Sequence, residues 1–281
     1  MEKGTILVTG ATGFIGKSVC RLLSENEIDF ITHKELNLDI TNEKSFEFSG
    51  AEKIKTVIHL AGKTFVPDSW KYPSEFMKVN AIGTMNVAEF CKKNGSHLIY
   101  VSAYVYGNTK QNPIAENHPA NVNNPYALSK KAGEDIALFY ADFFKVPVSI
   151  VRPFNVYGPN QNEMFLIPEV IKQVKQGKEI RVKDLNPKRD FIYVEDVAGI
   201  ILKLMETKSA GIYNAGSGKS CSVKELINCI QKVAGTNLPV ISENTVRENE
   251  ISDTVADISK AGKELLWHPL FTLEEGLKKC F

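Results

Sequence analysis

The segment that decides the fold is Val8-Thr9-Gly10-Ala11-Thr12-Gly13-Phe14-Ile15-Gly16. It joins an apolar strand-like run to an amphipathic helix-like run, so its three glycines lie where a strand turns into a helix. There Gly10 permits a tight turn, Gly13 lets the backbone approach a pyrophosphate, and Gly16 lets the helix pack close to the strand. Because the first N–H groups of a helix lack internal partners, they can bind an anion. The segment predicts a phosphate-binding turn.

Strands and helices alternate along the first half of the chain. The expected strands are Thr5–Thr9, Phe30–Thr32, Thr56–Leu60, His97–Val101 and Val148–Val151. The expected helices are Ile15–Leu23, Pro73–Lys92 and Pro125–Phe144. Such alternation predicts an α/β fold, with a doubly wound parallel (Rossmann) sheet whose strands are buried on both faces.

The alternation loosens after Arg152, where prolines and glycines become frequent. We expect a dinucleotide-binding Rossmann domain over residues 1–152 and a smaller substrate-binding lobe mainly over 153–281, with segments around 190–215 returning to the Rossmann sheet. The expected elements are helices at 169–176, 223–233 and 257–265, strands at 180–182 and 212–214, a polar loop at 186–189, and a segment at 194–205 that packs on the sheet.

Composition excludes several classes of protein. Hydrophobic residues make up 43% and charged residues 24% of the 281 residues, which argues against a disordered chain, a collagen and a coiled coil. Lys and Arg number 34 against 33 Asp and Glu, so no global charge attracts nucleic acid or an anionic membrane. The absence of a long apolar run or signal-peptide pattern predicts a cytoplasmic protein. Five scattered cysteines indicate neither a metal site nor a disulfide framework.

A second set of residues has the pattern of proton-transfer chemistry. Tyr126 and Lys130 lie four apart on an expected helix, and Ser102 follows an expected strand at the sheet edge where ligands bind. A tyrosine pKa near 10 is too high for a base at neutral pH, but an ammonium about 4 Å away contributes about 4 kcal/mol at an effective dielectric near 20. Lys130 can therefore lower the pKa of Tyr126, by an amount that desolvation of the phenolate partly offsets. The alternative is an ordinary surface pair.

With these residues the chain resembles the extended short-chain dehydrogenase/reductase family, which comprises nucleotide-sugar epimerases, dehydratases and reductases. The resemblance covers nearly the whole chain. It rests on Gly10 to Gly16, His59-Leu60-Ala61-Gly62, Asn80, the triad Ser102, Tyr126 and Lys130, Arg152-Pro153-Phe154-Asn155-Val156-Tyr157-Gly158-Pro159, and Arg189-Asp190-Phe191-Ile192. By this resemblance, Tyr126 exchanges a proton with a sugar oxygen that Ser102 hydrogen-bonds, while hydride moves to or from a nicotinamide.

The resemblance also implies which residues bind the ligands. The implied cofactor-binding residues are Gly10, Thr12, Gly13, Phe14, Ile15, Gly16, His33, Lys34, Asp39, Ile40, Leu60, Ala61, Gly62, Asn80, Tyr126, Lys130 and Pro153, with Asp39 at the adenine. The implied substrate-binding residues are Lys63, Ser102, Tyr104, Asn155, Arg189 and Arg247. Asn155 and the two arginines match positions that hold a diphosphate, and guanidinium groups suit phosphate oxygens. The implied partner is a nucleoside-diphosphate sugar.

The end of the second strand bears on the type of cofactor. An NAD site usually has a carboxylate about 20 residues after the glycines, where it binds the ribose hydroxyls. Asp29 lies at the other end of that strand, and Thr32-His33-Lys34 stands at its exit. Because a cation can pair with a 2′-phosphate, NADP(H) is favoured. A solvated Lys34 and NAD(H) remain the alternative.

Departures from the family pattern narrow the reaction. Sugar 4,6-dehydratases carry Asp-Glu directly after the triad serine or threonine, whereas this chain has Ala103 and Tyr104. Hydride transfer at C4 of the hexose remains. Lys34, the short chain and a reductase-like stretch at 35–39 favour a 4-keto-6-deoxyhexose reductase. The stretch 155–159 and the Arg247 segment resemble 4-epimerases with tightly bound NAD, which is the alternative. A dinucleotide-binding regulatory subunit without turnover is a third hypothesis.

The two long expected helices, Pro73–Lys92 and Pro125–Phe144, carry more apolar residues than one buried stripe requires. In the family the equivalent helices form a four-helix dimer interface, so the resemblance implies a homodimer. Packing of both faces inside one chain is the alternative.

Overall fold

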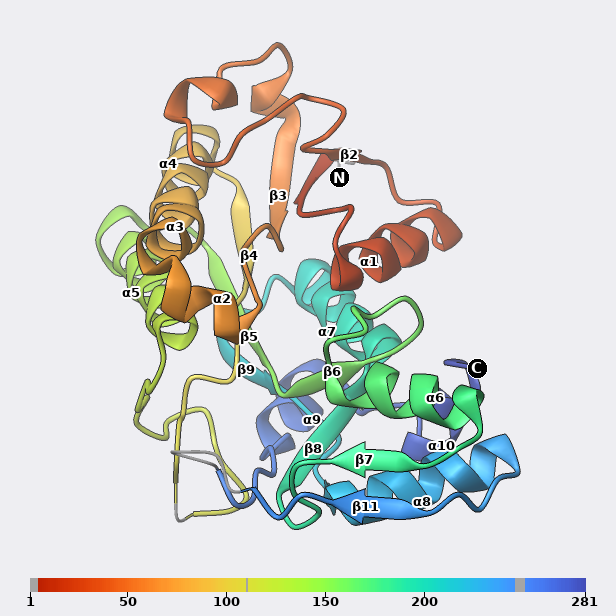
Figure 1. Cartoon of the computed structure of the whole chain (residues 1–281). Helices are drawn as coiled ribbons and strands as arrows, with labels where there is room; N and C mark the ends of the chain where they lie inside the picture. The colour runs from red at the N-terminus through yellow and green to blue at the C-terminus, as the bar shows by residue number, and fades with distance from the viewer. Residues whose placement is uncertain (1–4, 110, 246–250) are drawn as a thin grey trace.

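The computed structural model describes residues 5–109, 111–245 and 251–281. Its centre is a six-stranded parallel sheet in the order β2-β1-β3-β4-β5-β9 (Figure 1). The strands are β1 (Thr5–Thr9), β2 (Phe30–Thr32), β3 (Ile54–His59), β4 (His97–Val101), β5 (Val148–Pro153) and β9 (Gly211–Ala215). This confirms the predicted doubly wound parallel sheet.

The strand order changes direction next to β1. The chain goes from β1 to β2 on one side, and then to β3, β4, β5 and β9 on the other. In open α/β sheets the ligand crevice lies at the carboxyl ends of the strands where this reversal occurs. The candidate site must therefore lie above β1 and β3, with β4 beside them.

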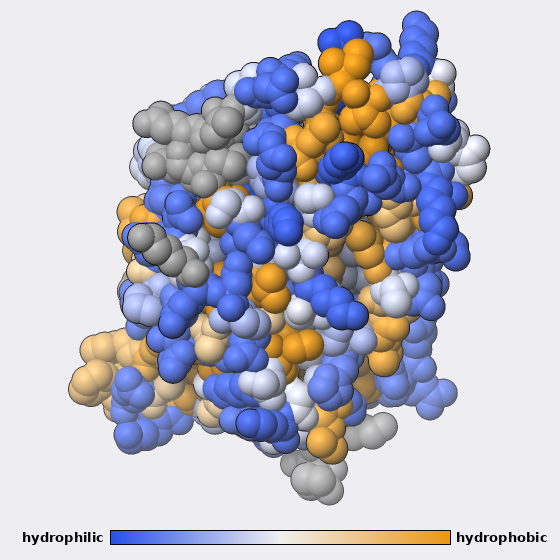
Figure 2. Space-filling view, turned by 90° about the horizontal axis from the view of Figure 1, so that it is seen from below, coloured by the Kyte–Doolittle hydropathy of each residue, from blue (hydrophilic) through white to orange (hydrophobic). Residues whose placement is uncertain are grey.

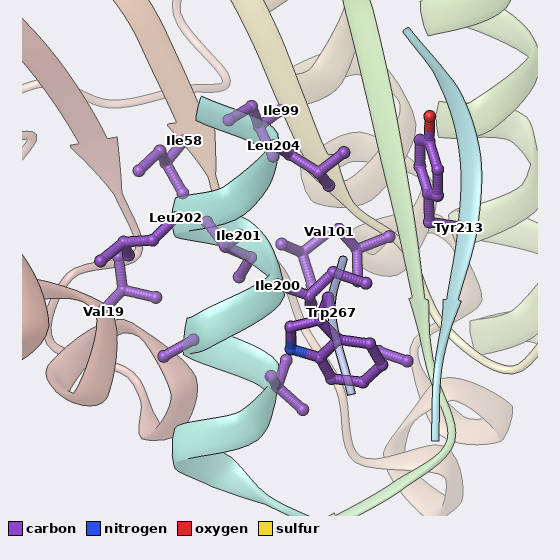
Figure 3. Close-up of a cluster of buried hydrophobic side chains, with 14 of the residues drawn as sticks. Val19, Ile58, Ile99, Val101, Ile200, Ile201, Leu202, Leu204, Tyr213 and Trp267 are labelled. Atoms are coloured by element: carbon purple, nitrogen blue, oxygen red, sulfur yellow. The ribbon is translucent and has the colours of Figure 1, made fainter. Parts of the chain in front are cut away.

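Helices cover both faces of the sheet. Helices α1 (Phe14–Glu25) and α7 (Val194–Thr207) pack together on one face, where Ile200, Ile201 and Leu204 meet Ile99 and Val101 of β4 (Figure 3). The other face is covered by α4 (Gly83–Asn94) and α5 (Pro125–Phe144). Both layers are almost wholly apolar, as expected for parallel strands buried on two sides.

A smaller lobe lies beside the carboxyl ends of the strands (Figure 1). It contains the sheets β10-β8-β6 and β11-β7 around a separate apolar core. Its elements are β6 (Asn155–Tyr157), α6 (Leu166–Gln176), β7 (Ile180–Val182), β8 (Lys188–Tyr193), β10 (Ser220–Ser222), α8 (Val223–Ala234), β11 (Val240–Ser242) and α10 (Leu273–Lys278). Helix α9 (Ser259–Leu265) instead packs on α7 and β9 in the core of the large sheet. Between β8 and β9 the chain returns to the large sheet through α7.

Three expected elements differ from the structure. The expected helix Pro73–Lys92 is α3 (Pro73–Met77), a π-helical turn (Lys78–Ile82) and then α4. The expected loop at 186–189 ends in β8, whose polar first residues pair with β10. Helix α6 begins at Leu166, because Pro168 lies in the first turn, where a missing N–H breaks no helical hydrogen bond. π-helical turns such as the one at Lys78–Ile82 are frequent at functional sites.

The surface seen from below the view of Figure 1 is mostly hydrophilic, and its apolar residues lie in separate groups (Figure 2). Within the described ranges, no helix combines the length and apolar character needed to cross a bilayer. All five cysteines are free thiols.

Candidate active site

The glycine-rich turn after β1 lets a ligand approach the protein backbone closely. Gly10 has φ of 71°, and a Cβ there would lie 2.5 Å from Ala61 N. At Gly16 a Cβ would lie 2.1 Å from Gly10 O, so α1 can begin this close to the strand only with glycine. Thr12 and Gly13 are exposed. No described side chain caps α1, and no acidic residue occupies its first turn. The start of α1 is therefore suited to an anion.

The helix start also joins the two lobes. Phe14 and Ile15 are half-buried and pack against the apolar core of the smaller lobe, and Ile15 also contacts the core under α1. A Cβ at Gly158 would lie 3.4 Å from Phe14 Cζ. A phosphate bound at α1 would thus lie beside the junction of the two lobes.

The exposed cation Lys34 follows β2 at the same edge of the sheet. Lys34 is exposed and has no ion pair with a described residue, while Glu35 folds back, since its carboxylate accepts hydrogen bonds from Thr32 N at 2.8 Å and Thr32 Oγ1 at 2.6 Å. His33 Nδ1 is buried without a hydrogen-bond partner among the described residues. A carboxylate suited to a ribose diol is therefore replaced here by Lys34 and His33.

The loop after β2 contributes Asp39 and Ile40. Asp39 is exposed, and its Oδ1 accepts from Thr41 N at 2.9 Å. Ile40 is buried, and its side chain fills the space beside Gly83, where a Cβ would lie 2.7 Å from Ile40 Cδ1. The loop is thereby fixed against α4, with the Asp39 carboxylate left at the surface.

The carboxyl end of β3 is held by Asn80, which lies in the π-helical turn. Asn80 Oδ1 accepts from Lys63 N at 2.9 Å, and Asn80 Nδ2 donates to Lys63 O at 3.0 Å and to Ser129 Oγ at 2.9 Å. Residues 60–62 follow β3 directly, and a Cβ at Gly62 would lie 3.8 Å from Lys130 Nζ. Asn80 thus brings the predicted residues Leu60, Ala61, Gly62 and Lys63 to α5.

Lys130 is the charged group at the centre of this arrangement. It is only 4% exposed, and its Nζ lies 4.4 Å from the centre of the Tyr100 ring. Burial lowers the pKa of Lys130 to about 7, and the Glu134 carboxylate opposes that shift. The cation is therefore partly neutral near pH 7 in the protein without ligand.

The expected acidification of Tyr126 is wrong for the protein without ligand. Tyr126 is half-buried, with its ring 6.3 Å from that of Phe76, and burial raises its pKa. The physical reason is that desolvation disfavours the phenolate, while burial of Lys130 removes part of the positive charge that would favour it. The Tyr126 phenol is therefore protonated at neutral pH.

Ser102 stands directly after β4, and its N–H donates to Val151 O at 2.8 Å. It is 4% exposed, and its Oγ has no hydrogen-bond partner among the described residues. A buried hydroxyl without a partner costs free energy unless a ligand or water completes its bonding. Ser102 Oγ is therefore available to a ligand oxygen.

The predicted substrate-binding residues divide into two groups. Tyr104, Asn155 and Arg189 lie on the lobe side: the Arg189 charge acts on the Tyr104 phenol, and Asn155 Nδ2 donates to Asp190 O at 3.1 Å. Pro153 ends β5 beside Ala215. On the opposite side, Lys63 pairs with Glu75 over the Phe76 ring. Arg247 lies outside the described residues.

Three buried polar residues, His59, Glu134 and Arg152, were given no role of their own from the sequence. His59 bonds Thr9 Oγ1 through Nδ1 at 2.7 Å and Thr84 Oγ1 through Nε2 at 3.1 Å, and burial together with Lys130 lowers its pKa to about 3. Glu134 pairs with Arg152 within the core. His59 and Arg152 stand inside motifs of the sequence and Glu134 stands in none. The hydrogen-bonding partners of all three lie far away in the chain.

Comparison with known proteins decides the family. The family model of the NAD dependent epimerase/dehydratase family matches residues 6–216. The chain belongs to this family. Its relatives include the GDP-6-deoxy-D-mannose reductase of Pseudomonas aeruginosa, 30% identical with 97% of this chain and 94% of the relative covered. The UDP-glucuronate 4-epimerase of Thermodesulfobacterium geofontis is also 30% identical, with 98% and 94% covered.

Solved structures of family members have the same fold. The structure of RMD from Pseudomonas aeruginosa complexed with NADPH has a TM-score of 0.90 at 29% identity, covering 98% of this chain and 97% of that one. The UDP-glucuronic acid 4-epimerase of Bacillus cereus, in complex with UDP-glucuronic acid and NAD, has a TM-score of 0.86 at 29% identity, with 98% and 97% covered. The predicted extended short-chain dehydrogenase/reductase membership is confirmed, and this family member is an NAD(P)-dependent enzyme.

Proposed function

We propose that this enzyme is an NADP(H)-dependent reductase of a nucleoside-diphosphate 4-keto-6-deoxyhexose. The observation that carries this choice is the positive charge at the end of β2, where Lys34 is exposed and the Glu35 carboxylate is engaged by Thr32. A cation there favours the phosphate of NADP(H), and reduction of a ketone also requires a proton donor at the carbonyl oxygen, which the Tyr126 phenol can supply. The relative named GDP-6-deoxy-D-mannose reductase supports the same substrate class.

The residues present suit a dinucleotide. The turn at Gly10 and Gly16 has no room for a Cβ, the start of α1 has no described cap, and Ser102 Oγ has no described partner. A bound nicotinamide dinucleotide would supply the hydride. Gly13 and the first N–H groups of α1 would bind its pyrophosphate, Asp39 its adenine, and Lys130 the ribose next to the nicotinamide.

The three candidate catalytic residues then have separate tasks. Ser102 Oγ donates a hydrogen bond to the C4 oxygen and so fixes the carbonyl. Tyr126 donates its proton to that oxygen as negative charge develops on it. Lys130 stabilises the resulting phenolate in its ammonium form, which burial disfavours and the Glu134 carboxylate favours.

The preference for NADP(H) rests on the end of β2. Lys34 is exposed without a described ion pair, and Glu35 is engaged by Thr32, so the local charge available to a ribose substituent is positive. A 2′-phosphate carries negative charge, and a nearby ammonium favours it. His33 Nδ1 is buried beside Lys34 without a described partner and would donate a second hydrogen bond.

The substrate's diphosphate is assigned to the lobe side. Arg189 lies close enough to Tyr104 for its charge to act on the phenol, its Nη1 donates to Ile251 O at 2.5 Å, and Asn155 is held by the backbone of Asp190. Asp190 is itself fixed by N–H groups of Ser217, Gly218 and Ala256 at 2.6, 3.0 and 3.0 Å. This rigid support suits a guanidinium that binds phosphate oxygens. Arg247, from the segment outside the described residues, is the second proposed cation.

Tyr104 bears on what happens at C6. Its hydroxyl donates to Gly107 O at 2.7 Å, burial raises its pKa, and its ring packs 5.2 Å from that of Phe154. The hydroxyl is thus engaged and remains protonated at neutral pH. Ala103 has no proton to exchange. Neither residue can supply the base that elimination of a C6 hydroxyl requires, so reduction at C4 is favoured over dehydration.

The experiment is to incubate the purified protein with a panel of nucleoside-diphosphate 4-keto-6-deoxyhexoses, with NADPH and with NADH. We expect one NADPH oxidised for each sugar reduced, measured by loss of the reduced-nicotinamide absorbance band. The same 4-keto sugars without cofactor are the control for spontaneous decay. Interconversion of two 4-hydroxy sugars without net cofactor consumption would overturn the assignment.

That outcome would establish the second candidate, a nucleoside-diphosphate-sugar 4-epimerase with tightly bound NAD. It is favoured by Asn155-Val156-Tyr157-Gly158-Pro159 and by similarity to a UDP-glucuronic acid 4-epimerase solved with NAD. A regulatory subunit is the third hypothesis, and binding of a dinucleotide without any turnover across the panel would support it.

We further propose that the enzyme is a homodimer through α4 and α5. These two helices pack side by side and leave large apolar side chains in solvent: Met85 (38% exposed), Leu128 (50%), Phe139 (50%), Phe143 (69%) and Phe144 (44%), with Ile82 (44%) in the π-helical turn before α4. Several exposed large apolar side chains on one pair of helices mark an interface. Analytical ultracentrifugation at micromolar concentration should give a dimer, and Phe143→Glu should give a monomer. A monomeric wild-type protein would contradict the proposal.

A further inference from the structure

A charged pair lies within the core behind the candidate catalytic residues. Arg152 Nε lies 2.9 Å from Glu134 Oε1, and Arg152 Nη2 lies 2.7 Å from Glu134 Oε2. The Glu134 side chain is fully buried and that of Arg152 is 5% exposed. Removing two charges from water costs several kcal/mol per ion, so a buried pair is weak support for stability alone. Its position gives it a second role.

Glu134 lies on the same side of α5 as the candidate catalytic residues. Tyr126, Lys130 and Glu134 follow one another at intervals of four residues, so they form one stripe along the helix. The stripe packs on Tyr100 of β4, whose hydroxyl donates to Lys130 O at 3.2 Å. At Gly133 a Cβ would lie 2.4 Å from Tyr100 Oη. Helix α5 therefore lies unusually close to the sheet here.

Arg152 lies in β5, on the sheet side of the contact between α5 and the sheet. It follows Val151, whose carbonyl accepts the Ser102 N–H at 2.8 Å. Arg152 Nη1 donates to Glu116 O at 3.1 Å, and its guanidinium lies 4.9 Å from the centre of the Tyr106 ring. Each guanidinium nitrogen thus has a partner, and the group has one fixed orientation.

We propose that Glu134 and Arg152 are a positioning pair that fixes the helix carrying Tyr126 and Lys130 against the strand end carrying Ser102, with a carboxylate one helical turn from the Lys130 ammonium. The roles of those three residues are taken from the proposed function. The pair itself touches neither the substrate nor the cofactor in this account. It determines the separation of the groups that do.

The carboxylate has an electrostatic consequence for Lys130. The titratable groups around Lys130 are Tyr126 and Glu134 on α5, His59 on β3 and Tyr100 on β4. Tyr126 and Tyr100 are neutral at pH 7, since the ordinary pKa of a phenol is near 10 and burial raises it further, and His59 is neutral because its pKa is about 3. Glu134 is therefore the negative charge that favours the ammonium form of Lys130. Without it, Lys130 should lose its proton at lower pH.

The test is the double substitution Glu134→Leu/Arg152→Met, which replaces the pair by apolar side chains of similar size and is often tolerated for folding. The matched control is Asp135→Asn, which removes the exposed partner of Lys131 on the same helix. The protonation of Lys130 is followed by NMR of protein labelled with ¹³C-lysine, with the signal assigned by Lys130→Met. Thermal unfolding and the Kd for NADP⁺ are measured in parallel.

We expect the Lys130 midpoint to fall in the double variant, and by less than in the single variant Glu134→Gln, because the double variant also removes the positive charge of Arg152. We expect NADP⁺ to bind about tenfold more weakly, and Asp135→Asn to match the wild type in both measurements. A folded double variant with an unchanged Lys130 midpoint and unchanged NADP⁺ affinity would overturn the proposal.

A second series covers failure of the double variant to fold. Glu134→Gln keeps an oxygen that accepts from Arg152 but removes the charge, whereas Glu134→Asp keeps the charge. The Lys130 midpoint should fall in the first variant and be restored toward the wild-type value in the second. Equal midpoints in Gln and Asp variants would overturn the proposal. Because the titration is made on the protein without ligand, it decides the role of the pair even if the wild type binds no dinucleotide and the proposed function fails.

Discussion

The side chain of Asn80 holds the backbone of Lys63 from both sides: Oδ1 accepts from Lys63 N at 2.9 Å and Nδ2 donates to Lys63 O at 3.0 Å. Asn80 lies in the π-helical turn between α3 and α4, and its Nδ2 also reaches Ser129 on α5. One buried amide therefore connects the end of β3 to the helix that carries Tyr126 and Lys130.

Replacing Asn80 by Ala should loosen both ends of this connection. It leaves the buried Lys63 N–H and carbonyl without partners, which costs about 1–3 kcal/mol of unfolding free energy. We also expect weaker dinucleotide binding, because Gly62 and Lys130 lose their fixed separation. Urea denaturation and isothermal titration calorimetry measure the two effects. Asn94→Ala, which removes a hydrogen bond to Phe90 O at the end of α4, is the control and should leave dinucleotide affinity unchanged.

Gly16→Ala should abolish dinucleotide binding and destabilise the fold. The new Cβ would lie 2.1 Å from Gly10 O, so either α1 or the glycine turn must move. Gly199→Ala is the matched control on α7, where the nearest atom is Trp267 Nε1 at 3.6 Å. That control should be neutral or more stable by up to about 1 kcal/mol, since Ala favours a helix over Gly. Equal effects at both positions, in thermal unfolding and NADP⁺ titration, would refute the close packing of α1.

The unfolding free energy should fall as the pH drops below about 6.5, partly through His97. This residue is 3% exposed, its Nε2 lies 2.7 Å from Ser149 Oγ, and burial, then the Lys208 charge, lowers its pKa to about 4. Its pKa is lower in the folded than in the unfolded chain, so the unfolded chain gains the proton first, between about pH 6.5 and 4. Each group whose pKa is lower in the folded chain changes the unfolding free energy by up to about 1.4 kcal/mol per pH unit.

His97→Gln removes that titration and should make the pH dependence shallower. Denaturant unfolding of the variant and the wild type at several pH values between 7 and 4 isolates the contribution of His97, since the other acidic groups titrate in both proteins. Parallel curves would show that His97 is not held neutral in the folded chain.

Lys34→Ala should weaken NADP⁺ binding and leave NAD⁺ binding nearly unchanged. A single exposed ammonium beside a phosphate contributes about 1 kcal/mol, which corresponds to roughly a fivefold change in Kd, and the difference should shrink at high salt. Lys53→Ala, an exposed lysine before β3, is the control for net charge. The same loss for both cofactors would place Lys34 away from the 2′-position.

The sequence predicted elements best where the signals are local. Helix α5 has its predicted bounds, because Asn124 Oδ1 accepts from Ala127 N at 2.8 Å, Pro125 occupies the first position, and the helix ends at left-handed Lys145. The glycine turn was predicted because each glycine has a local steric task. Strands β6, β10 and β11 were missed, since each has three residues and owes its existence to a partner strand remote in sequence.

The features of the candidate site also divide into those that are local in sequence and those that depend on the folded chain. The spacing of Tyr126 and Lys130 on one helix is a local property, and the strand order brings Ser102 to the same edge of the sheet. Their pKa values are not local, because they depend on how deeply the folded chain buries each group. The sequence therefore did not predict that the pKa of Tyr126 lies above that of a free tyrosine. Glu134 and Arg152 were missed for the same reason, as their importance lies in their contact across 18 residues.

The central claim is that the Tyr126 phenol donates the proton at C4 while hydride is transferred. The most direct measurement compares the wild type with Tyr126→Phe, using NADPH and the nucleoside-diphosphate 4-keto-6-deoxyhexose identified in the panel. We predict that the variant binds NADPH with little change in Kd and that its kcat falls by about 10²–10⁴-fold. A Tyr126→Phe enzyme that reduces the sugar at nearly the wild-type rate would contradict the account.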